Sequence, residues 1–513
     1  MKIERILIED QMAPIGLDEK KPVFSWLLTA EEGEQNLMQS ACRIVVRTGE
    51  DTVWDSGKME TGVSTGIGYE GEALQPCTKY EVKAEVWDNH GGKAEAESSF
   101  ETGLMDSLYA AWEGAEWIGA PHATVCAENR GVFTIESEFR MEGGKGEAGI
   151  VFGANDFRLN DHTKNELGME GENYIRYAVC LEEGDARLEI YRVGYAPEDT
   201  AEKPFAVTKL VNWKEKTQEI LTPENANAFH KLTVEVDGNV AYAYVDGILV
   251  DAIEEHGFFG TKVSGRQLNP RGNNDVLPYP RLNEIGFYAG KGTTGYFKNL
   301  TVRNVRKPSA EIVRETPEGR LDGGKSIFAD QIPVENGYFK AEDSQITADP
   351  SHHSIPMLRS CISCQKEKKL ASARLYITAR GIYDCRINGQ EITEDLLRPG
   401  LTQYDHRINY QTYDITGLMK PGRNGIGVTL ASGWWSEAQT FVVKNFNYFG
   451  DKESLLAKVV MKYKDGSREV FGTNTEDWKY FGEGPYLFSS YFAGEQYDAR
   501  RAEVYETYSL PEF

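Results

Sequence analysis

Short segments that alternate apolar and polar residues recur along the whole chain and are separated by turn residues. Residues 42–46 (CRIVV), 133–140 (FTIESEFR) and 371–379 (ASARLYITA) are examples. A repeat of two residues is typical of a strand with one buried face, whereas a helix repeats every 3.6 residues. No helical pattern separates these segments, which favours antiparallel sheets. The sequence therefore predicts an all-β protein.

The chain has 513 residues, which is too long for a single hydrophobic core. We predict a β-sandwich over residues 1–105, a jelly roll of the concanavalin type over 106–305 and another β-sandwich over 338–500. Residues 306–337 are charged and contain Pro and Gly, so we interpret them as a linker. The segment AAWEGAEWIGAP (110–121) is interpreted as a hinge between the first two regions.

The charge of the chain restricts its partners. There are 80 acidic and 56 basic residues, and the net charge is −24. Long-range repulsion then disfavours nucleic acid and anionic membranes, and neutral ligands or cations are better candidates. The amino terminus (MKIERILIED) alternates charged and aliphatic residues and lacks the pattern of a signal peptide. With seven scattered cysteines as well, we expect a cytoplasmic protein.

The first region carries a structural motif. Residues 74–80 (LQPCTKY), followed by EVWDNHGG (85–92), resemble a fibronectin type III domain. In such domains a tyrosine near a strand start closes a corner by hydrogen-bonding back to the backbone. The resemblance assigns that role to Tyr80.

The most specific stretch is residues 398–435, RPGLTQYDHRINYQTYDITGLMKPGRNGIGVTLASGWW. It resembles a motif block of the bacterial α-L-rhamnosidases, glycoside hydrolase family 78, as do residues 494–500 (GEQYDAR). In that family the block lies in a β-sandwich ahead of an (α/α)6 barrel that holds the catalytic carboxylates. The resemblance implies that this chain carries the N-terminal β-domains without the barrel, and that residues 501–513 begin the connection to it.

Inverting glycoside hydrolysis needs a carboxylic acid and a carboxylate base about 6.5–9.5 Å apart. The resemblance places both in the barrel, so no catalytic residue is assigned in this chain. Glu495, Asp498 and Arg500 are interpreted as interface residues rather than as acid and base. The aromatic cluster that contains Trp434 and Trp435 is interpreted either as an interface for the barrel, bound in cis or in trans, or as a surface that stacks on sugars.

The loops of the second region concentrate carboxylates and side-chain amides. These groups can hydrogen-bond sugar hydroxyls or supply the oxygen ligands that calcium prefers. The region resembles a family 67 carbohydrate-binding module, in which calcium and rhamnose share a site. The candidate sugar-binding residues are Asn155, Asp156, Glu172, Asn173, Asn273 and Asn274. Asp156 and Asn173 are the candidate calcium ligands. The alternative is that these side chains cap turns, as Asn and Asp often do.

A possible zinc pattern is also present. Cys361 and Cys364 are spaced CxxC and follow His352 and His353. A structural zinc site usually has four ligands at recognised spacings, and there is no second CxxC. We interpret the cysteines as incidental thiols.

Three functions follow. The chain is expected to be the ancillary part of an α-L-rhamnosidase, which binds rhamnose-containing glycosides and supports a barrel that cleaves terminal α-L-rhamnose with inversion. The alternatives are a free-standing, calcium-dependent rhamnose lectin and an enzyme that is active as it stands.

Overall fold

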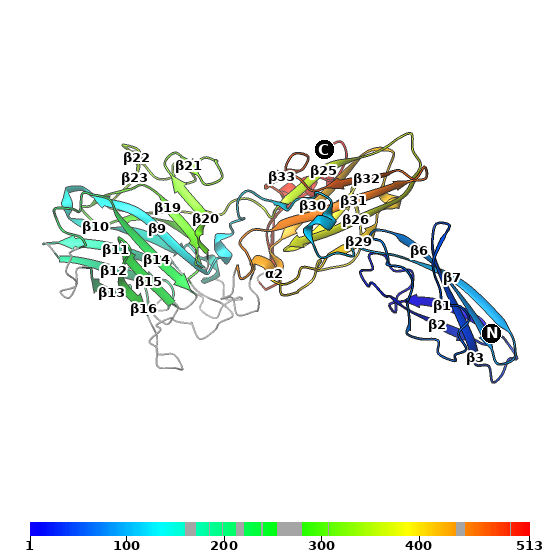
Figure 1. Cartoon of the computed structure of the whole chain (residues 1–513). Helices are drawn as coiled ribbons and strands as arrows, with labels where there is room; N and C mark the ends of the chain where they lie inside the picture. Colours follow the sequence, from blue (N-terminus) through cyan, green and yellow to red (C-terminus); the bar gives the residue numbers. More distant parts are fainter. Residues whose placement is uncertain are drawn as a thin grey trace.

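The computed structural model describes residues 1–159, 171–183, 185–196, 198–211, 220–237, 240–253, 280–305, 307–437, 447–492 and 494–513. These residues form three β-sandwiches arranged in an elongated molecule (Figure 1). The sandwich formed last in the sequence lies in the middle, between the other two (Figure 1). The paired strands are antiparallel, and the prediction of an all-β fold is confirmed.

The first sandwich packs a three-stranded sheet on a four-stranded one. The first sheet contains β1 (Lys2–Ile8), β2 (Val23–Thr29) and β5 (Ile67–Gly68), and the second contains β4 (Asp51–Asp55), β3 (Gln39–Thr48), β6 (Lys79–Asp88) and β7 (Lys93–Glu101). The alternate residues of β6 face a core that includes Trp26 and Phe100. The Tyr80 hydroxyl accepts a hydrogen bond from the backbone amide of Gln75 at 2.8 Å, so the predicted tyrosine corner is confirmed.

The second sandwich has two large sheets around one core. One sheet, in spatial order, is β13 (Phe205–Leu210), β12 (Asp185–Val193), β11 (Tyr174–Glu182), β10 (Gly146–Ala154), β17 (Glu284–Ala289) and β24 (Gln345–Ala348). The other is β16 (Ile248–Ile253), β15 (Val240–Val245), β14 (His230–Asp237), β9 (Val132–Met141), β18 (Thr294–Phe297), β23 (Tyr338–Glu342) and β22 (Val334–Glu335), joined by β19 (Leu300–Asn304), β20 (Lys307–Thr316) and β21 (Gly319–Arg320).

The domain boundary predicted near residue 338 is wrong. Three strands lie within the predicted linker 306–337, and β20 pairs with β19 of the second sandwich. Strands β23 and β24 also pair with β18 and β17, so the second sandwich continues to Ala348. Strand β20 has a polar sequence because it lies at the margin of the sheet, where only three of its ten residues are buried.

The third sandwich is made of two five-stranded sheets. They contain β28 (Gln390–Glu391), β27 (Ile382–Ile387), β30 (Gly422–Ala431), β25 (Met357–Cys364) and β33 (Lys479–Phe481), and β29 (Gln411–Asp414), β26 (Leu370–Arg380), β31 (Ser454–Tyr463) and β32 (Arg468–Gly472) with β8 (Ile118–Gly119). A hairpin of β34 (Tyr486–Ser490) and β35 (Gly494–Tyr497) precedes a last helix, α3 (Ala502–Thr507). Among the described residues, no helix has the length and apolar character needed to span a bilayer.

The predicted hinge at residues 110–121 is packed against the third sandwich. Strand β8 pairs with β31, and Trp112 lies in an apolar cluster with Tyr376 and Leu456. The chain thus contacts the third sandwich before it enters the second one. We call residues 121–127, which enter the second sandwich, and 349–355, which leave it, the neck. Val125 and His352 join the two segments through mutual backbone hydrogen bonds of 3.2 and 3.1 Å.

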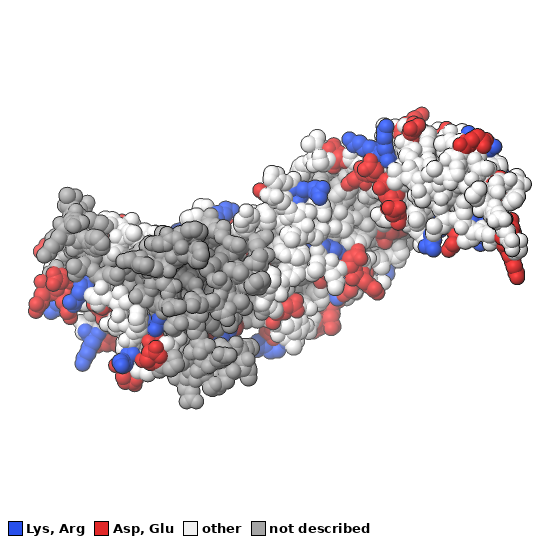
Figure 2. Space-filling model, turned by 90° about the horizontal axis from the view of Figure 1, so that it is seen from below, with Lys and Arg blue, Asp and Glu red and all other residues white. Residues whose placement is uncertain are grey.

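Acidic and basic side chains are interspersed over the face of the molecule seen in Figure 2. Many charged side chains of the described residues are paired at close range, as in the Lys93–Glu85 and Lys298–Glu138 contacts.

Candidate functional site

Two of the predicted sugar-binding loops, those with Asn155 and Asn173, meet at one edge of the second sandwich. Asn155 follows β10 and Asn173 precedes β11, and these strands are antiparallel neighbours. The backbone amide of Asn155 donates to the carbonyl of Asn173 at 3.0 Å. The backbone amide of Asp156 donates to Oδ1 of Asn173 at 2.7 Å, and Nδ2 of Asn173 donates to the Asp156 carbonyl at 3.3 Å. The structure therefore brings Asn155, Asp156 and Asn173 together.

Asp156 is buried and paired with a cation. Arg158 donates from Nε to Oδ1 at 2.8 Å and from Nη2 to Oδ2 at 2.7 Å. Nη1 of the same guanidinium donates to the carbonyl of Glu128. Both oxygens of Asp156 and both amide atoms of Asn173 thus hold the loop together. The oxygens of this set already accept hydrogen bonds within the loop, and calcium binding at this edge stays a prediction.

Among the described residues of this edge, Asn155, Phe157 and Glu172 are accessible, and we call them the rim. The Phe157 side chain is 54% exposed, and Asn155 and Glu172 are also exposed. Nδ2 of Asn155 donates to Glu284 at 2.7 Å, which fixes the direction of its amide. Gly194 makes the close packing of this edge possible, since a Cβ there would lie 2.4 Å from the Glu172 carbonyl oxygen. An amide, a carboxylate and an aromatic ring are the groups that bind sugars. Asn273 and Asn274 lie outside the described residues.

The two tryptophans predicted as an interface are half-buried on the third sandwich. They belong to α2 (Gly433–Ser436). Nε1 of Trp435 donates to the Lys452 carbonyl at 2.9 Å, and its ring stacks on Phe449. The Trp434 ring lies 4.5 Å from that of Tyr491. Trp435 therefore packs within the sandwich, whereas Trp434 lies beside a surface groove.

The predicted interface residues of the GEQYDAR segment make local contacts. Glu495 accepts from Ser489 at 3.0 Å across the β34–β35 hairpin. Arg500 donates to both oxygens of Asp498 at 2.8 Å and holds the pKa of that carboxyl at about 2. Within the described chain these residues form no inter-domain ion pair. Gln496 makes the inter-domain contact instead, because its Oε1 accepts from the Cys126 thiol at 3.1 Å and its Nε2 donates to Glu128.

A groove of about 360 Å³ lies next to this hairpin. Its lining includes Tyr383, Asp384, Leu396, Tyr491, Glu495 and Tyr505. Leu396 is 81% exposed, and Leu397 and Phe492 are exposed as well. The groove thus combines aromatic walls, two carboxylates and an apolar margin.

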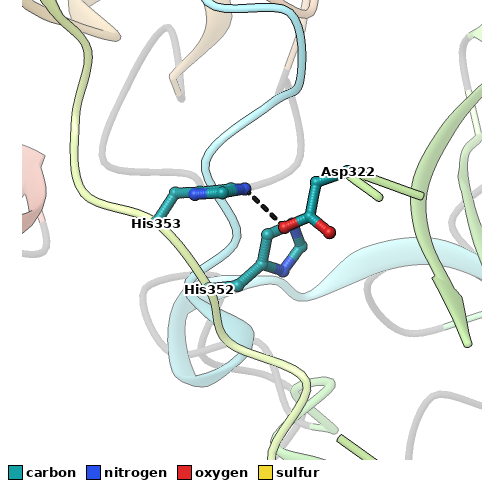
Figure 3. Close-up of side chains that lie close together, drawn as sticks. All are labelled: Asp322, His352 and His353. Carbon is teal, nitrogen blue, oxygen red and sulfur yellow. Dashed lines mark ion pairs between the residues drawn. The ribbon is translucent and has the colours of Figure 1, made fainter. Parts of the chain in front are cut away.

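The histidines near the CxxC pattern do not meet the cysteines. Cys364 lies in the core of the third sandwich, while His352 and His353 lie in the neck beside Asp322 (Figure 3). One ligand atom from each of these three residues lies within 4.8 Å of the other two. Burial lowers the pKa of His352 to about 4, so that this imidazole is neutral near pH 7. Sequence spacing did not reveal Asp322, because it is distant in the sequence and is contributed by a different loop.

The fold defines a multidomain β-sandwich protein. Residues 368–512 match the α-L-rhamnosidase N-terminal domain, and residues 3–106 match the Rha78A-like N-terminal immunoglobulin domain. An α-L-rhamnosidase of Streptomyces avermitilis is 27% identical over 96% of this chain. Two parts of the chain thus match N-terminal β-domains of the α-L-rhamnosidases.

Other comparisons also match α-L-rhamnosidases, and they cover only part of each relative. An α-L-rhamnosidase of Formosa agariphila is 40% identical over 25% of this chain and 14% of its own length. The crystal structure of the S. avermitilis α-L-rhamnosidase complexed with L-rhamnose superposes with a TM-score of 0.54 at 21% identity, over 100% of this chain and 44% of that one. The S. avermitilis sequence alignment covers 42% of that relative. The chain thus spans less than half the length of this relative.

Proposed function

We propose that this chain is the ancillary, substrate-positioning part of an α-L-rhamnosidase, and that cleavage of terminal α-L-rhamnose takes place in a catalytic barrel supplied in cis or in trans. The observation that carries the proposal is the alignment with the S. avermitilis enzyme, which spans 96% of this chain but 42% of the relative. The whole enzyme would act on rhamnose-containing glycosides with inversion.

The rim of the second sandwich suits the sugar. L-Rhamnose has a ring with hydroxyl groups and a methyl group in place of a hydroxymethyl group. Asn155 and Glu172 offer donors and acceptors for adjacent hydroxyls, and the exposed Phe157 ring offers a surface for C–H groups. The ion pair between Asp156 and Arg158 keeps this loop in shape.

The groove of the third sandwich suits a protein partner. Exposed leucines at a groove margin are typical of interfaces. Leu396, Leu397 and Phe492 would be covered by a catalytic barrel, while Glu495 would offer it a hydrogen-bonding group. This assignment replaces Trp435 as a docking residue, because Trp435 is already packed in the sandwich.

Titration calorimetry of L-rhamnose into the chain tests the sugar site. We expect binding that Phe157→Ala and Asn155→Ala each weaken at least tenfold, and that the matched control Phe492→Ala leaves unchanged. Binding that is lost with a chelator and restored by calcium would support the calcium prediction. Equal binding by all variants would contradict the rim as the site.

A hydrolysis assay on an aryl α-L-rhamnoside tests the ancillary role. We expect no turnover by the chain alone, and turnover only when a catalytic barrel of the family is present. Turnover by the chain alone that Glu495→Gln abolishes would contradict the proposal. If the chain binds the sugar but a catalytic barrel neither binds the chain nor benefits from its sugar binding, the lectin alternative is favoured.

A further inference from the structure

We propose that Asp322, His352 and His353 bind one divalent transition-metal ion of the zinc class, and that this ion fastens the neck of the second sandwich. The three side chains come from two segments. Asp322 follows β21, and the two histidines lie on the neck segment that leaves β24. This site is independent of the proposed sugar rim and of the groove.

His353 presents a nitrogen that no hydrogen bond uses. Its Nε2 is buried and has no hydrogen-bond partner in the described part of the chain. The same atom lies 2.8 Å from Oδ2 of Asp322, so the two groups approach closely without hydrogen-bond alignment (Figure 3). A ring nitrogen and a carboxylate oxygen at such a separation can be neighbouring ligands of one metal ion, whose bonds to them are about 2.0–2.2 Å long.

His352 is held in the form that binds metals. Its Nδ1 lies 2.9 Å from the carbonyl oxygen of Pro350. A carbonyl oxygen can only accept, so Nδ1 carries the proton and Nε2 keeps a lone pair. Metal-binding histidines commonly have this arrangement, in which the second ring nitrogen donates to a carbonyl.

The Asp322 carboxylate is fixed from the opposite side. Gly324 donates its backbone amide to Oδ1 at 2.8 Å, and Arg320 donates to Oδ1 at 3.2 Å and to Oδ2 at 2.9 Å. Each carboxylate oxygen has more than one acceptor position, so Oδ2 can accept from Arg320 and still bind a cation. The Asp322 side chain is 5% exposed, so its position is set by the fold.

The donor set selects the class of metal. Two imidazoles and one carboxylate suit zinc and related transition metals, whereas calcium prefers oxygen ligands alone. Three protein ligands leave one position of a tetrahedral ion for water or for a further side chain. His122, on the entering segment of the neck, interacts electrostatically with Asp322 and His353. A bound ion would join the leaving segment to the loop that follows β21, beside the Val125–His352 pairing.

The test uses the full chain, stripped of metal with a chelator and then titrated with Co²⁺ or Zn²⁺. We expect uptake of one equivalent of Zn²⁺ by elemental analysis, and visible d–d absorption from bound Co²⁺ that Zn²⁺ removes. His352→Ala combined with His353→Ala should abolish both signals, and Asp322→Asn should weaken binding at least tenfold. Ca²⁺ should not compete.

Two controls separate this site from the alternatives. His406→Ala removes a histidine whose side chain is 75% exposed on the third sandwich, and it should leave the metal content unchanged. Cys361→Ser with Cys364→Ser should also leave it unchanged. A loss of metal in the cysteine variant, or no stoichiometric uptake by the unaltered chain, would overturn the proposal.

A second measurement avoids dependence on the folding of the variants. In the unaltered chain, Zn²⁺ should slow amide hydrogen exchange at Val125 and His352, which bond each other across the neck. Amides of the first sandwich, such as that of Val82, should be unaffected. Unchanged exchange at the neck upon addition of Zn²⁺ would overturn the proposal.

Discussion

The first and second sandwiches are attached to the third in different ways. The first sandwich and the segment after it are held by side chains. The Arg374 guanidinium donates to both carboxylate oxygens of Glu101, at 2.6 and 2.7 Å. The Tyr410 hydroxyl donates to Asp18 at 2.6 Å and accepts from the backbone amide of Leu104. The second sandwich is held through the neck, where backbone pairing and the Asp322 cluster lie close to the side-chain contacts of Gln496.

The difference predicts how each attachment responds to its surroundings. Charged side chains respond to pH and to the removal of one partner, because a buried charge without its partner is costly. Backbone hydrogen bonds respond much less to pH. The first attachment should therefore loosen in acid, whereas the neck should respond to metal.

The largest effect is expected from Arg374→Met. The Arg374 and Glu101 side chains are mostly buried, so the substitution leaves a carboxylate without its cation and should lower the free energy of unfolding by about 3 kcal/mol. Chemical denaturation and limited proteolysis of residues 105–121 would measure it. Arg43→Met, which removes a partly exposed pair with Asp55, is the matched control and should change little. Equal effects of the two variants would contradict a special role of the junction.

Gln496→Ala should weaken the attachment of the second sandwich. The substitution removes hydrogen bonds to the Cys126 thiol and the Glu128 carboxylate, which should cost about 1.5 kcal/mol. Faster amide exchange over residues 121–128, with unchanged exchange in the first sandwich, is the expected result. Gln75→Ala removes a hydrogen bond on the exposed surface and serves as control. Exchange that rises equally in both sandwiches would show that the attachments are coupled.

Acid should act on the first attachment through Glu113. Arg468 and Lys458 lower the pKa of Glu113 to about 2, which is below its ordinary value of 4.5. The stabilisation is present above pH 4.5 and is lost as the pH falls towards 2. Because the Glu113 side chain is 37% exposed, solvent screening reduces the contribution to about 1 kcal/mol. Glu113→Gln should flatten the decline of unfolding temperature between pH 5 and 2, and an unchanged slope would contradict this origin.

The smallest effect is expected from Arg500→Ala. This side chain is 88% exposed and bonds Asp498 of its own turn, so the unfolding temperature should stay within experimental error. A measurable loss of stability in the isolated chain would contradict the local role. Weaker binding of an added catalytic barrel, with unchanged unfolding, would support a docking role for this segment.

Much of the fold could be predicted from the sequence because strands have a local pattern. The strand expected at residues 133–140 is β9, from Val132 to Met141, and the one expected at 371–379 lies within β26, from Leu370 to Arg380. The boundary after residue 305 could not be predicted, because the largely exposed or half-buried residues of β20 resemble a linker.

The candidate sites also differ in how much of each could be predicted from the sequence. Asn155 and Asn173 flank neighbouring strands, and their proximity follows from that pairing. The pairing of Asp156 with Arg158 was missed, although the two residues are close in sequence. The cluster of Asp322 with His352 and His353 depends on where two distant loops cross. No local pattern encodes such a crossing.

The neck also bears on how such a protein can change over evolutionary time. The chain enters and leaves the second sandwich through two segments that lie side by side at Val125 and His352. When the two ends of a domain are this close, recombination can replace the whole domain without disturbing the body from which it projects. A new second sandwich could then be acquired in a single genetic event, while the third sandwich keeps its own packing.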